Sequence, residues 1–149
     1  MPPITTPRIP TIDYEKADPA AREIFDHYKQ ERGNVPNMFR TVAHRPEILR
    51  TMIAHFRAVM ETGTVGVKLK ELVIVRTSQL NQCEYCLNSH TQLAQQHGWS
   101  EAQITDLANF RNRTDFNERE KAALELAAAI GLFNYFNRFN NSLKMEPTK

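Results

Sequence analysis

The sequence lacks the features that mark a membrane protein or a nucleic-acid-binding protein. No run approaches the 18 consecutive apolar residues that indicate a membrane-spanning helix. Its 19 basic and 17 acidic side chains leave a net charge of +2, which creates no strong field around the chain. It has no internal repeat and no low-complexity tract. We therefore expect neither a membrane nor a nucleic acid as a partner.

Cysteine is also scarce, with two residues in 149. Whether two cysteines form a lasting disulfide depends on the cellular compartment, and the start of the chain is informative about that compartment. Residues 1–12 carry prolines at positions 2, 3, 7 and 10 instead of a basic region followed by an apolar segment. We expect an extended N-terminal arm over residues 1–17 and a cytoplasmic location. In a reducing compartment, two cysteines three positions apart are more often catalytic or metal-binding than a lasting crosslink.

The length and composition suit one ordinary soluble domain. Apolar residues make up 41% of the chain and charged residues 24%, and 149 residues are enough to bury one hydrophobic core. We place this domain at residues 18–144 and read residues 145–149 as a tail.

Helix signals follow one another along that domain. Proline or an N-cap residue opens several segments, glycine closes others, and two capping boxes pair Ser100 with Gln103 and Asn117 with Glu120. Trp99 and Ile104 are positioned to form a hydrophobic staple around the first box. The expected helices cover residues 20–31, 36–44, 46–60, 67–80, 83–97, a segment opened by Ser100, and 118 to about 141.

The run Leu72-Val73-Ile74-Val75 is ambiguous, because β-branched residues in a row also suit a buried strand. A strand leading into a Cys-x-x-Cys helix is the thioredoxin arrangement. A thioredoxin-like sheet needs several more strands, and no second β-rich alternating segment is present. We therefore predict a buried helix over residues 67–80.

Two apolar stripes at helical spacing indicate packed helices. We expect the first to be core and the second to be core or subunit contact. Helices with such faces need partners to bury them, so the sequence predicts an all-α single-domain bundle of about six to seven helices, assembled as an oligomer. The stripes comprise Ile48, Leu49, Met52, Ile53, Phe56, Val59 and Met60, and then Phe133, Phe136 and Phe139.

The two cysteines, Cys83 and Cys86, are followed by His90 at offsets of three and four residues. On a helix these three side chains fall within one arc, and Cα atoms three apart lie about 5–6 Å apart, within the range of a disulfide. The helix N-terminus and a nearby imidazole both favour a reactive thiolate. This cluster is typical of a redox or peroxide-reducing site.

Glu71 lies on the preceding predicted helix, twelve positions before Cys83. If the two helices pack antiparallel across Asn81-Gln82, its carboxylate can face His90, hold the imidazole tautomer and stabilise the imidazolium. A buried glutamate would be costly without such a partner. The alternative places Glu71 at the solvent edge beside Lys68 and Lys70.

With these residues in view, the chain resembles the alkylhydroperoxidase D-like, peroxidase-related branch of the carboxymuconolactone decarboxylase superfamily. The matching motif is Glu-x11-Cys-x2-Cys-x3-His, from Glu71 to His90. Two further segments, 34–39 (Asn-Val-Pro-Asn-Met-Phe) and 133–140 (Phe-Asn-Tyr-Phe-Asn-Arg-Phe-Asn), also look like members of this branch. The resemblance implies an all-helical fold whose hairpin carries the motif, assembly into trimers or hexamers, and hydroperoxide reduction without metal or other cofactor.

Carried over residue by residue, the resemblance implies that Cys86 attacks the peroxide and becomes a sulfenic acid, which Cys83 resolves as a disulfide. His90 takes the thiol proton and Glu71 completes the relay. A dithiol reductant or a reductase protein then reopens the bridge. The position of Cys83 at the helix N-terminus instead favours that sulfur as the leading thiolate, as in Cys-x-x-Cys oxidoreductases.

The chain departs from the family pattern at two places. Tyr85 stands where the best-known members have histidine, so it is at most an auxiliary hydrogen-bond donor, since a phenol is a poor base near neutral pH. The segment between Leu124 and Ile130 is shorter than in similar members.

Other functions remain open at this point. Zinc needs four ligands, and Cys83, Cys86, His90 and Glu71 are all suitable, although structural zinc usually gathers two ligand pairs. An oxidant sensor or general disulfide oxidoreductase would share the first chemical step, and a decarboxylase of the superfamily would treat the cysteines as incidental. The remaining histidines are expected to be surface or structural residues: His27, His44, His55 and His97.

Overall fold

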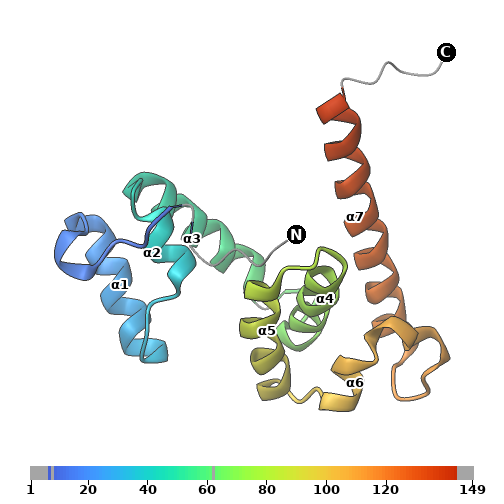
Figure 1. Ribbon diagram of the computed structural model, residues 1–149. Helices are drawn as coiled ribbons and strands as arrows, with labels where there is room; N and C mark the ends of the chain where they lie inside the picture. Colours follow the sequence, from blue (N-terminus) through green and yellow to red (C-terminus); the bar gives the residue numbers. More distant parts are fainter. Residues whose placement is uncertain (1–6, 8, 62, 144–149) are drawn as a thin grey trace. The chain divides into compact units, whose positions relative to one another are not determined.

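The computed structural model describes residues 7, 9–61 and 63–143, with the backbone alone at residues 128, 129, 132, 133 and 135–143. Every regular element in these residues is helical, which confirms the all-α prediction (Figure 1). The chain divides into two compact units, Met1–Met60 and Glu61–Lys149. The elements are η1 (Tyr14–Lys16), α1 (Pro19–Arg32), α2 (Asn37–Val42), α3 (Pro46–Met60), α4 (Val67–Leu80), α5 (Glu84–Gln96), α6 (Glu101–Thr105), η2 (Leu107–Asn112) and α7 (Glu118–Leu143).

The first unit packs α3 against α1 and α2. Asp18 caps α1 by accepting the backbone N–H of Ala20, with Pro19 in the first turn, and Gly33 ends the helix in the left-handed conformation (φ 76°). Inside, the rings of Tyr28 and Phe39 lie 4.7 Å apart. The buried core comprises Ala17, Ala21, Phe25, Tyr28, Phe39, Ala43, Leu49 and Ile53.

The expected extended arm is only partly extended. Residues Tyr14–Lys16 form a 3₁₀ turn, and Ala17 is buried in the core of the first unit. The backbone of Ile12 exchanges hydrogen bonds with the main chain and side chain of Arg40 on α2. These contacts satisfy backbone groups that a free arm would leave to water. The earlier part of the arm, residues 1–6 and 8, lies outside the described residues.

The apolar stripe of α3 is core in part. Leu49 and Ile53 are buried and Met52 packs against them, whereas Ile48 is 47% exposed and Val59 50% exposed. The stripe is wider than the face that α1 and α2 cover, and periodicity cannot tell how much of an apolar stripe its neighbours bury.

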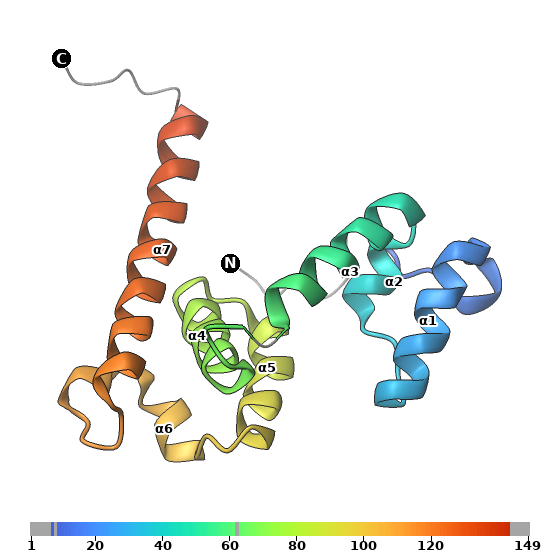
Figure 2. The ribbon, with the colours of Figure 1, turned by 180° about the vertical axis from the view of Figure 1, so that it is seen from behind.

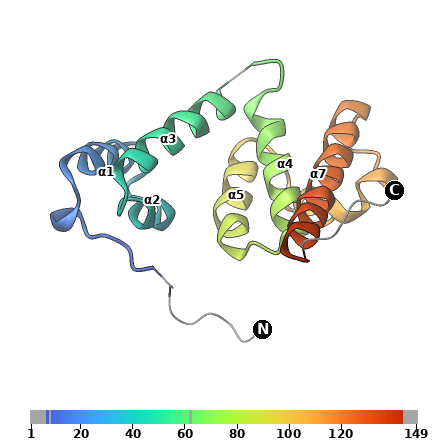
Figure 3. The same ribbon diagram turned by 90° about the horizontal axis from the view of Figure 1, so that it is seen from above.

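The second unit is built around α4, which lies between α5 and α7; Figures 2 and 3 show these helices from behind and from above. The run Leu72–Val75 is helical, with Leu72 and Val75 fully buried, so the thioredoxin alternative is excluded. The buried core comprises Leu72, Val75, Ala94, Trp99, Ile104, Leu107, Phe110, Phe116 and Leu124.

Both predicted capping boxes are present. The Ser100 hydroxyl accepts the backbone N–H of Gln103, whose side chain in turn accepts the N–H of Ser100. Asn117 and Glu120 exchange the equivalent bonds at the start of α7. Trp99 and Ile104, the predicted staple, are buried in the same core, where the indole Nε1–H donates to the carbonyl of Lys68 at 2.7 Å.

Arg113 ties together the turn between η2 and α7. Its guanidinium makes a bidentate contact with Asp115 (2.9 and 2.7 Å), and Nη1 also donates to Asp106 (3.1 Å) and to the carbonyl of Ala102 (3.2 Å). Hydrogen bonding by Arg113 lowers the pKa of Asp115, and the two carboxylates raise the pKa of Arg113. This polar corner fixes α6 relative to the start of α7.

The last helix is continuous through the segment from Leu124 to Ile130. Its inner face places Leu124, Ala127 and Gly131 inside the second unit, while Leu126 and Ile130 are exposed. The side chains of Phe133, Phe136 and Phe139, and the predicted tail at 145–149, lie outside the described residues. Among the described residues, no helix is both long and apolar enough to cross a membrane.

Candidate functional site

Helices α4 and α5 form a hairpin, and the connection between them consists of Asn81, Gln82 and Cys83. The N–H of Gln82 donates to the carbonyl of Gln79, and the N–H of Cys83 donates to the carbonyl of Ser78 at 3.0 Å. This is the Schellman arrangement, in which the residue after the C-cap is left-handed. Here that residue is Gln82, with φ 53°, and not the usual glycine.

Cys83 therefore serves two helices at once. It closes the cap of α4 through its backbone N–H and is also the N-cap of α5, where its Sγ accepts the backbone N–H of Cys86 at 3.4 Å. The expected helix start at residue 83 moves by one position, because Cys83 has non-helical dihedral angles (φ −91°, ψ 88°). The end is as expected, with Gly98 left-handed after His97.

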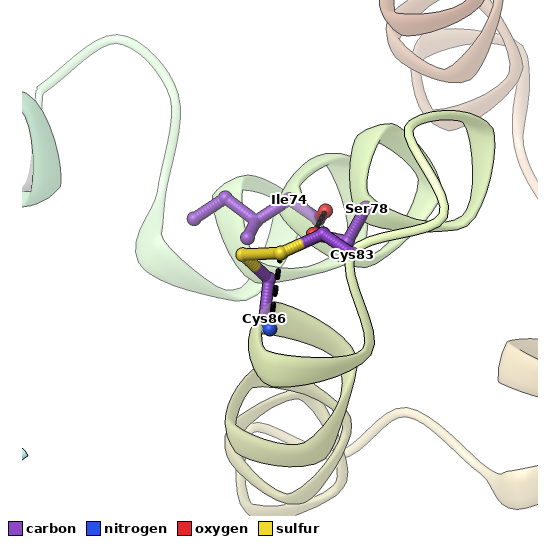
Figure 4. Close-up of a disulfide and its surroundings, with 4 residues drawn as sticks. All are labelled: Ile74, Ser78, Cys83 and Cys86. Atoms are coloured by element: carbon purple, nitrogen blue, oxygen red, sulfur yellow. Dashed lines mark hydrogen bonds between the residues drawn. A yellow bond between two sulfur atoms is a disulfide. The ribbon is translucent and has the colours of Figure 1, made fainter. Parts of the chain in front are cut away.

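The two cysteines are joined in a disulfide, with Cα atoms 5.4 Å apart as the helical spacing predicts. Figure 4 shows the bridge beside Ile74 on α4, with Ser78 close to Cys83. The Ser78 hydroxyl is buried and donates to the carbonyl of Ile74 at 2.7 Å. Both cysteines are half-buried, so neither sulfur is shielded by a deep core.

Glu71 and His90 form the polar part of the site. The carboxylate lies inside the hairpin, with Glu71 3% exposed, and its Oε2 is 2.8 Å from Nδ1 of His90 across the two helices. The solvent-edge alternative for Glu71 is excluded by this burial. His90 is four residues from Cys86 on α5, which places both on the same side of the helix.

This contact assigns the roles of the two imidazole nitrogens. When Glu71 is ionised its carboxylate only accepts hydrogen bonds, and this contact then requires the tautomer in which Nδ1 of His90 is the donor. In the neutral imidazole the remaining nitrogen, Nε2, is then the basic one. The arrangement can accept a proton at Nε2 and stabilise the resulting imidazolium through Glu71.

The remaining candidates lie around this core. Tyr85 is at the second position of α5, between the cysteines, and is 46% exposed. Among the other histidines, His27 is 3.2 Å from Glu31, an exposed carboxylate partner one turn away that the spacing analysis did not single out, and His44 contacts the carbonyl of Pro10. Within the described part of the chain, no three histidine, cysteine, aspartate or glutamate side chains gather as a metal site.

Sequence reasoning missed two structural residues of the site, Gln82 and Ser78. The connection between the two predicted helices, 67–80 and 83–97, is only two residues long and contains no glycine. Such a short turn requires a residue in the left-handed conformation. The length of the connection could therefore have predicted that conformation for Gln82. No sequence signal marks Ser78, because its role depends on the carbonyl groups of the surrounding turn.

A family model and a curated relative both match part of this chain. The family model described as "Carboxymuconolactone decarboxylase family" matches residues 46–129, which include the whole α4–α5 hairpin. A curated relative, the uncharacterized protein YdfG of Bacillus subtilis (strain 168), is 38% identical over 87 residues. That alignment covers 58% of each chain, so the chain spans less than two thirds of this relative's length.

Two crystal structures have a similar fold over nearly the whole chain. The first is an alkylhydroperoxidase AhpD core, an uncharacterized peroxidase-related protein from Ralstonia eutropha JMP134, with 25% identity and a TM-score of 0.58 over 95% of this chain and 92% of that one. The second is an alkylhydroperoxidase AhpD core from Rhodospirillum rubrum ATCC 11170, with 22% identity and a TM-score of 0.60 over 96% and 95%.

The family match covers more than half of the chain and contains the Cys-x-x-Cys hairpin, and the all-helical fold agrees with both crystal structures. The chain therefore belongs to the carboxymuconolactone decarboxylase family, in its alkylhydroperoxidase D-like branch.

Proposed function

We propose that this protein is a thiol-dependent hydroperoxide reductase that cycles through the Cys83–Cys86 disulfide. The observation that carries the proposal is the buried Glu71–His90 pair, 2.8 Å between oxygen and nitrogen, one helical turn from a cysteine of a disulfide-forming pair. A carboxylate–imidazole pair beside a thiol is the arrangement that activates a cysteine nucleophile. The likeness to a peroxidase-related AhpD core supports hydroperoxides as the substrate class.

The oxidative half of the cycle begins at Cys86 and His90, with Glu71 stabilising the imidazolium that forms. His90 Nε2 takes the proton of the Cys86 thiol, and the thiolate attacks one peroxide oxygen, so that the O–O bond breaks and the alkoxide leaves. The alkoxide receives the proton from His90 and departs as an alcohol. Cys86 is left as a sulfenic acid.

Cys83 completes this half by attacking the sulfur of Cys86 as a thiolate. The new S–S bond forms as the S–O bond breaks, and the oxygen leaves as water after taking a proton. One hydroperoxide and two thiols thus give one alcohol, one water and one disulfide. A dithiol reductant then reopens the bridge, and we expect the active protein to be a trimer or hexamer.

The test is hydroperoxide consumption in the presence of a dithiol, compared between the wild type, Cys86→Ser and Cys83→Ser. We expect sustained consumption only by the wild type. Metal content is measured on the same samples. Wild-type consumption no faster than that of Cys86→Ser would refute the proposal, and a stoichiometric amount of zinc would replace it with a metal site.

A further inference from the structure

We propose that Cys83 is the sulfur that leaves as a thiolate when the disulfide is reduced, and that the incoming reductant thiolate bonds to Cys86. This inference rests on the proposed dithiol-driven cycle and assigns a separate task to each sulfur within it. Three features of the α4–α5 hairpin carry the argument: a hydrogen bond to Cys83, the fixed backbone of Cys83, and the position of His90.

The first feature is the hydrogen bond from the backbone N–H of Cys86 to Sγ of Cys83, 3.4 Å between nitrogen and sulfur. A hydrogen bond to the charged form of a group favours that form. Cys83 is also the N-cap of a helix of 13 residues, where unpaired N–H groups favour negative charge.

The second feature is that Cys83 is fixed from both sides. Its N–H is bound to the carbonyl of Ser78, and the left-handed Gln82 sets the direction in which the chain enters α5. Neither contact involves a sulfur atom, so both persist when the S–S bond breaks. The thiolate of Cys83 then remains where the N–H of Cys86 stabilises it, without reorganisation of the backbone.

The third feature is the set of charged and titratable groups near the two sulfurs. On α5, Glu84 and Tyr85 lie between the cysteines in sequence and are exposed, so solvent screens the charge of Glu84 and it does not distinguish the two sulfurs. On α4, the Glu71 carboxylate makes its hydrogen bond with His90. His90 is four residues from Cys86 and seven from Cys83 on α5, so it is placed to return a proton to Cys86.

These features give the order of bond changes in reduction. The first thiolate of the reductant attacks Sγ of Cys86, the S–S bond breaks, and its electron pair leaves on Sγ of Cys83, because the more stable thiolate is the better leaving group. The second thiolate of the reductant then attacks the reductant sulfur bound to Cys86. The reductant becomes a disulfide and Cys86 leaves and is protonated. Of the two protons lost by the reductant thiols, one goes to Cys86 and the other to solvent, because Cys83 stays a thiolate.

The same thiolate suits the oxidative half. A standing thiolate at Cys83 attacks the sulfenic acid of Cys86 without first losing a proton. Cys86 is activated only when His90 takes its proton. The two sulfurs are thus prepared by different means, one by the helix N-terminus and the other by a base.

The inference is tested with the single-cysteine chains Cys86→Ser and Cys83→Ser. Serine is a good N-cap residue, so Cys83→Ser retains the start of α5, and circular dichroism checks that both chains are folded. Alkylation by iodoacetamide is followed from about pH 5 to pH 10, because only the thiolate reacts. The denatured chains are the control, in which both thiols should ionise alike.

We expect the folded chain carrying only Cys83 to reach half-ionisation at least about one pH unit below the chain carrying only Cys86. Equal or reversed midpoints would overturn the inference. As a second readout, oxidised wild type is treated with the monothiol 2-mercaptoethanol, quenched in acid and mapped by mass spectrometry. An adduct on Cys86 agrees with the inference, and an adduct on Cys83 or equal adducts on both sulfurs contradict it.

Neither readout involves a peroxide, so the outcomes can be separated. A chain with the expected ionisation and adduct that consumes no hydroperoxide refutes the proposed function and leaves the assignment of the two sulfurs intact. A chain that consumes hydroperoxide but forms its adduct on Cys83 refutes the assignment alone.

Discussion

The side chain of Glu71 shows how burial and charge together define the site at the scale of single residues. It is 3% exposed within a helix that also buries Leu72 and Val75, and its carboxylate oxygen contacts His90 Nδ1 at 2.8 Å. Removing one partner leaves the other buried group without its hydrogen bond, which costs about 1–3 kcal/mol. A near-isosteric change is therefore the cleanest test of what the pair does.

The substitution Glu71→Gln should slow hydroperoxide reduction by roughly 10-fold to 100-fold, less than the roughly 10²–10⁴-fold that a positioned acid or base contributes, because the imidazole itself is retained. Glutamine removes the negative charge that stabilises the imidazolium, and wherever its amide nitrogen donates to Nδ1 of His90 the proton moves to Nε2, which is then no longer a base. Stopped-flow measurement of the initial oxidation rate checks this result.

The matched control for this variant is Glu84→Gln, an exposed carboxyl on the same hairpin. It should leave the oxidation rate within about twofold of wild type, since a solvent-exposed charge is largely screened. Equal rates for Glu71→Gln and wild type would remove Glu71 from the proton relay.

These single residues also show what sequence alone can predict. The spacing from Glu71 to His90 anticipates a contact that the structure contains, because two helices joined by a short turn must pack antiparallel. The N-cap role of Cys83 was not anticipated. It depends on backbone dihedral angles at one residue, and the boundary of a helix is the least certain part of a sequence-based assignment.

At the scale of elements, the C-terminal caps of α4 and α5 can be compared with each other. The ends of α4 and α5 have the same Schellman pattern, with Gln82 left-handed in one (φ 53°) and Gly98 in the other (φ 88°). A non-glycine residue in this conformation is strained by roughly 1–2 kcal/mol. The junction that positions Cys83 therefore bears a strain that the end of α5 avoids.

Reciprocal substitutions at these caps should shift stability in opposite directions. We expect Gln82→Gly to raise the free energy of unfolding by about 1 kcal/mol and Gly98→Gln to lower it by about the same amount. A Cβ at position 98 would meet Lys68 Nζ at 3.7 Å, an ordinary contact, so the backbone conformation is the cause. Urea unfolding monitored by circular dichroism measures both changes.

Gly63→Ala serves as the control for the two cap variants. This glycine has no positive φ, and nothing lies within 4 Å of an added Cβ. Its unfolding midpoint should not fall. A decrease in stability for Gln82→Gly would mean that the glutamine side chain stabilises the turn by more than its backbone strain costs.

The contacts of Arg113 with Asp106 and Asp115 predict that the stability of the folded chain depends on pH. Hydrogen bonding to Arg113 lowers the pKa of Asp115 below its ordinary value of 3.8, so the folded chain holds this carboxyl ionised to lower pH than the unfolded chain does. The contribution is complete above that ordinary value and is lost as the pH falls through the lowered folded pKa. Asp115→Asn should therefore lower the Tm at pH 7 and lose this effect in strong acid.

Thermal unfolding of Asp115→Asn and wild type over this pH range checks the prediction. Arg113→Lys should also lower the Tm at pH 7, because lysine cannot make the bidentate contact with Asp115. A Tm difference for Asp115→Asn that stays constant down to strong acid would show that the ionised carboxylate is not the stabilising form.

At the scale of the whole molecule, the chain is divided between two hydrophobic cores. One gathers around Phe25 and Leu49 in the first unit, and the other around Leu72, Leu107 and Phe110 in the second unit, which carries the site. Sequence periodicity predicted the helices of both units. It did not predict two cores, since the expected division was an arm, one domain and a tail.

The two cores predict which side chains cannot be shortened without loss of stability. Leu72→Ala should lower the free energy of unfolding of the second unit by about 2–5 kcal/mol, because Leu72 is fully buried and its removal leaves a cavity. Leu126→Ala on α7 is the matched control, since Leu126 is 64% exposed, and should change stability by no more than about 0.5 kcal/mol. Denaturant unfolding followed by Trp99 fluorescence reports on the second unit, and equal effects of the two variants would contradict the assigned core.

The most direct test of the proposed function is the stoichiometry of product formation. Reduced protein is mixed first with a limiting amount of an organic hydroperoxide and no dithiol, and then with an excess of both hydroperoxide and dithiol, and the alcohol and the Cys83–Cys86 disulfide are quantified in each case. We predict one alcohol for each disulfide formed, and many alcohols per protein once the dithiol is added. Disulfide formation without alcohol, or a single equivalent of alcohol however much dithiol is present, would contradict a catalytic hydroperoxide reductase.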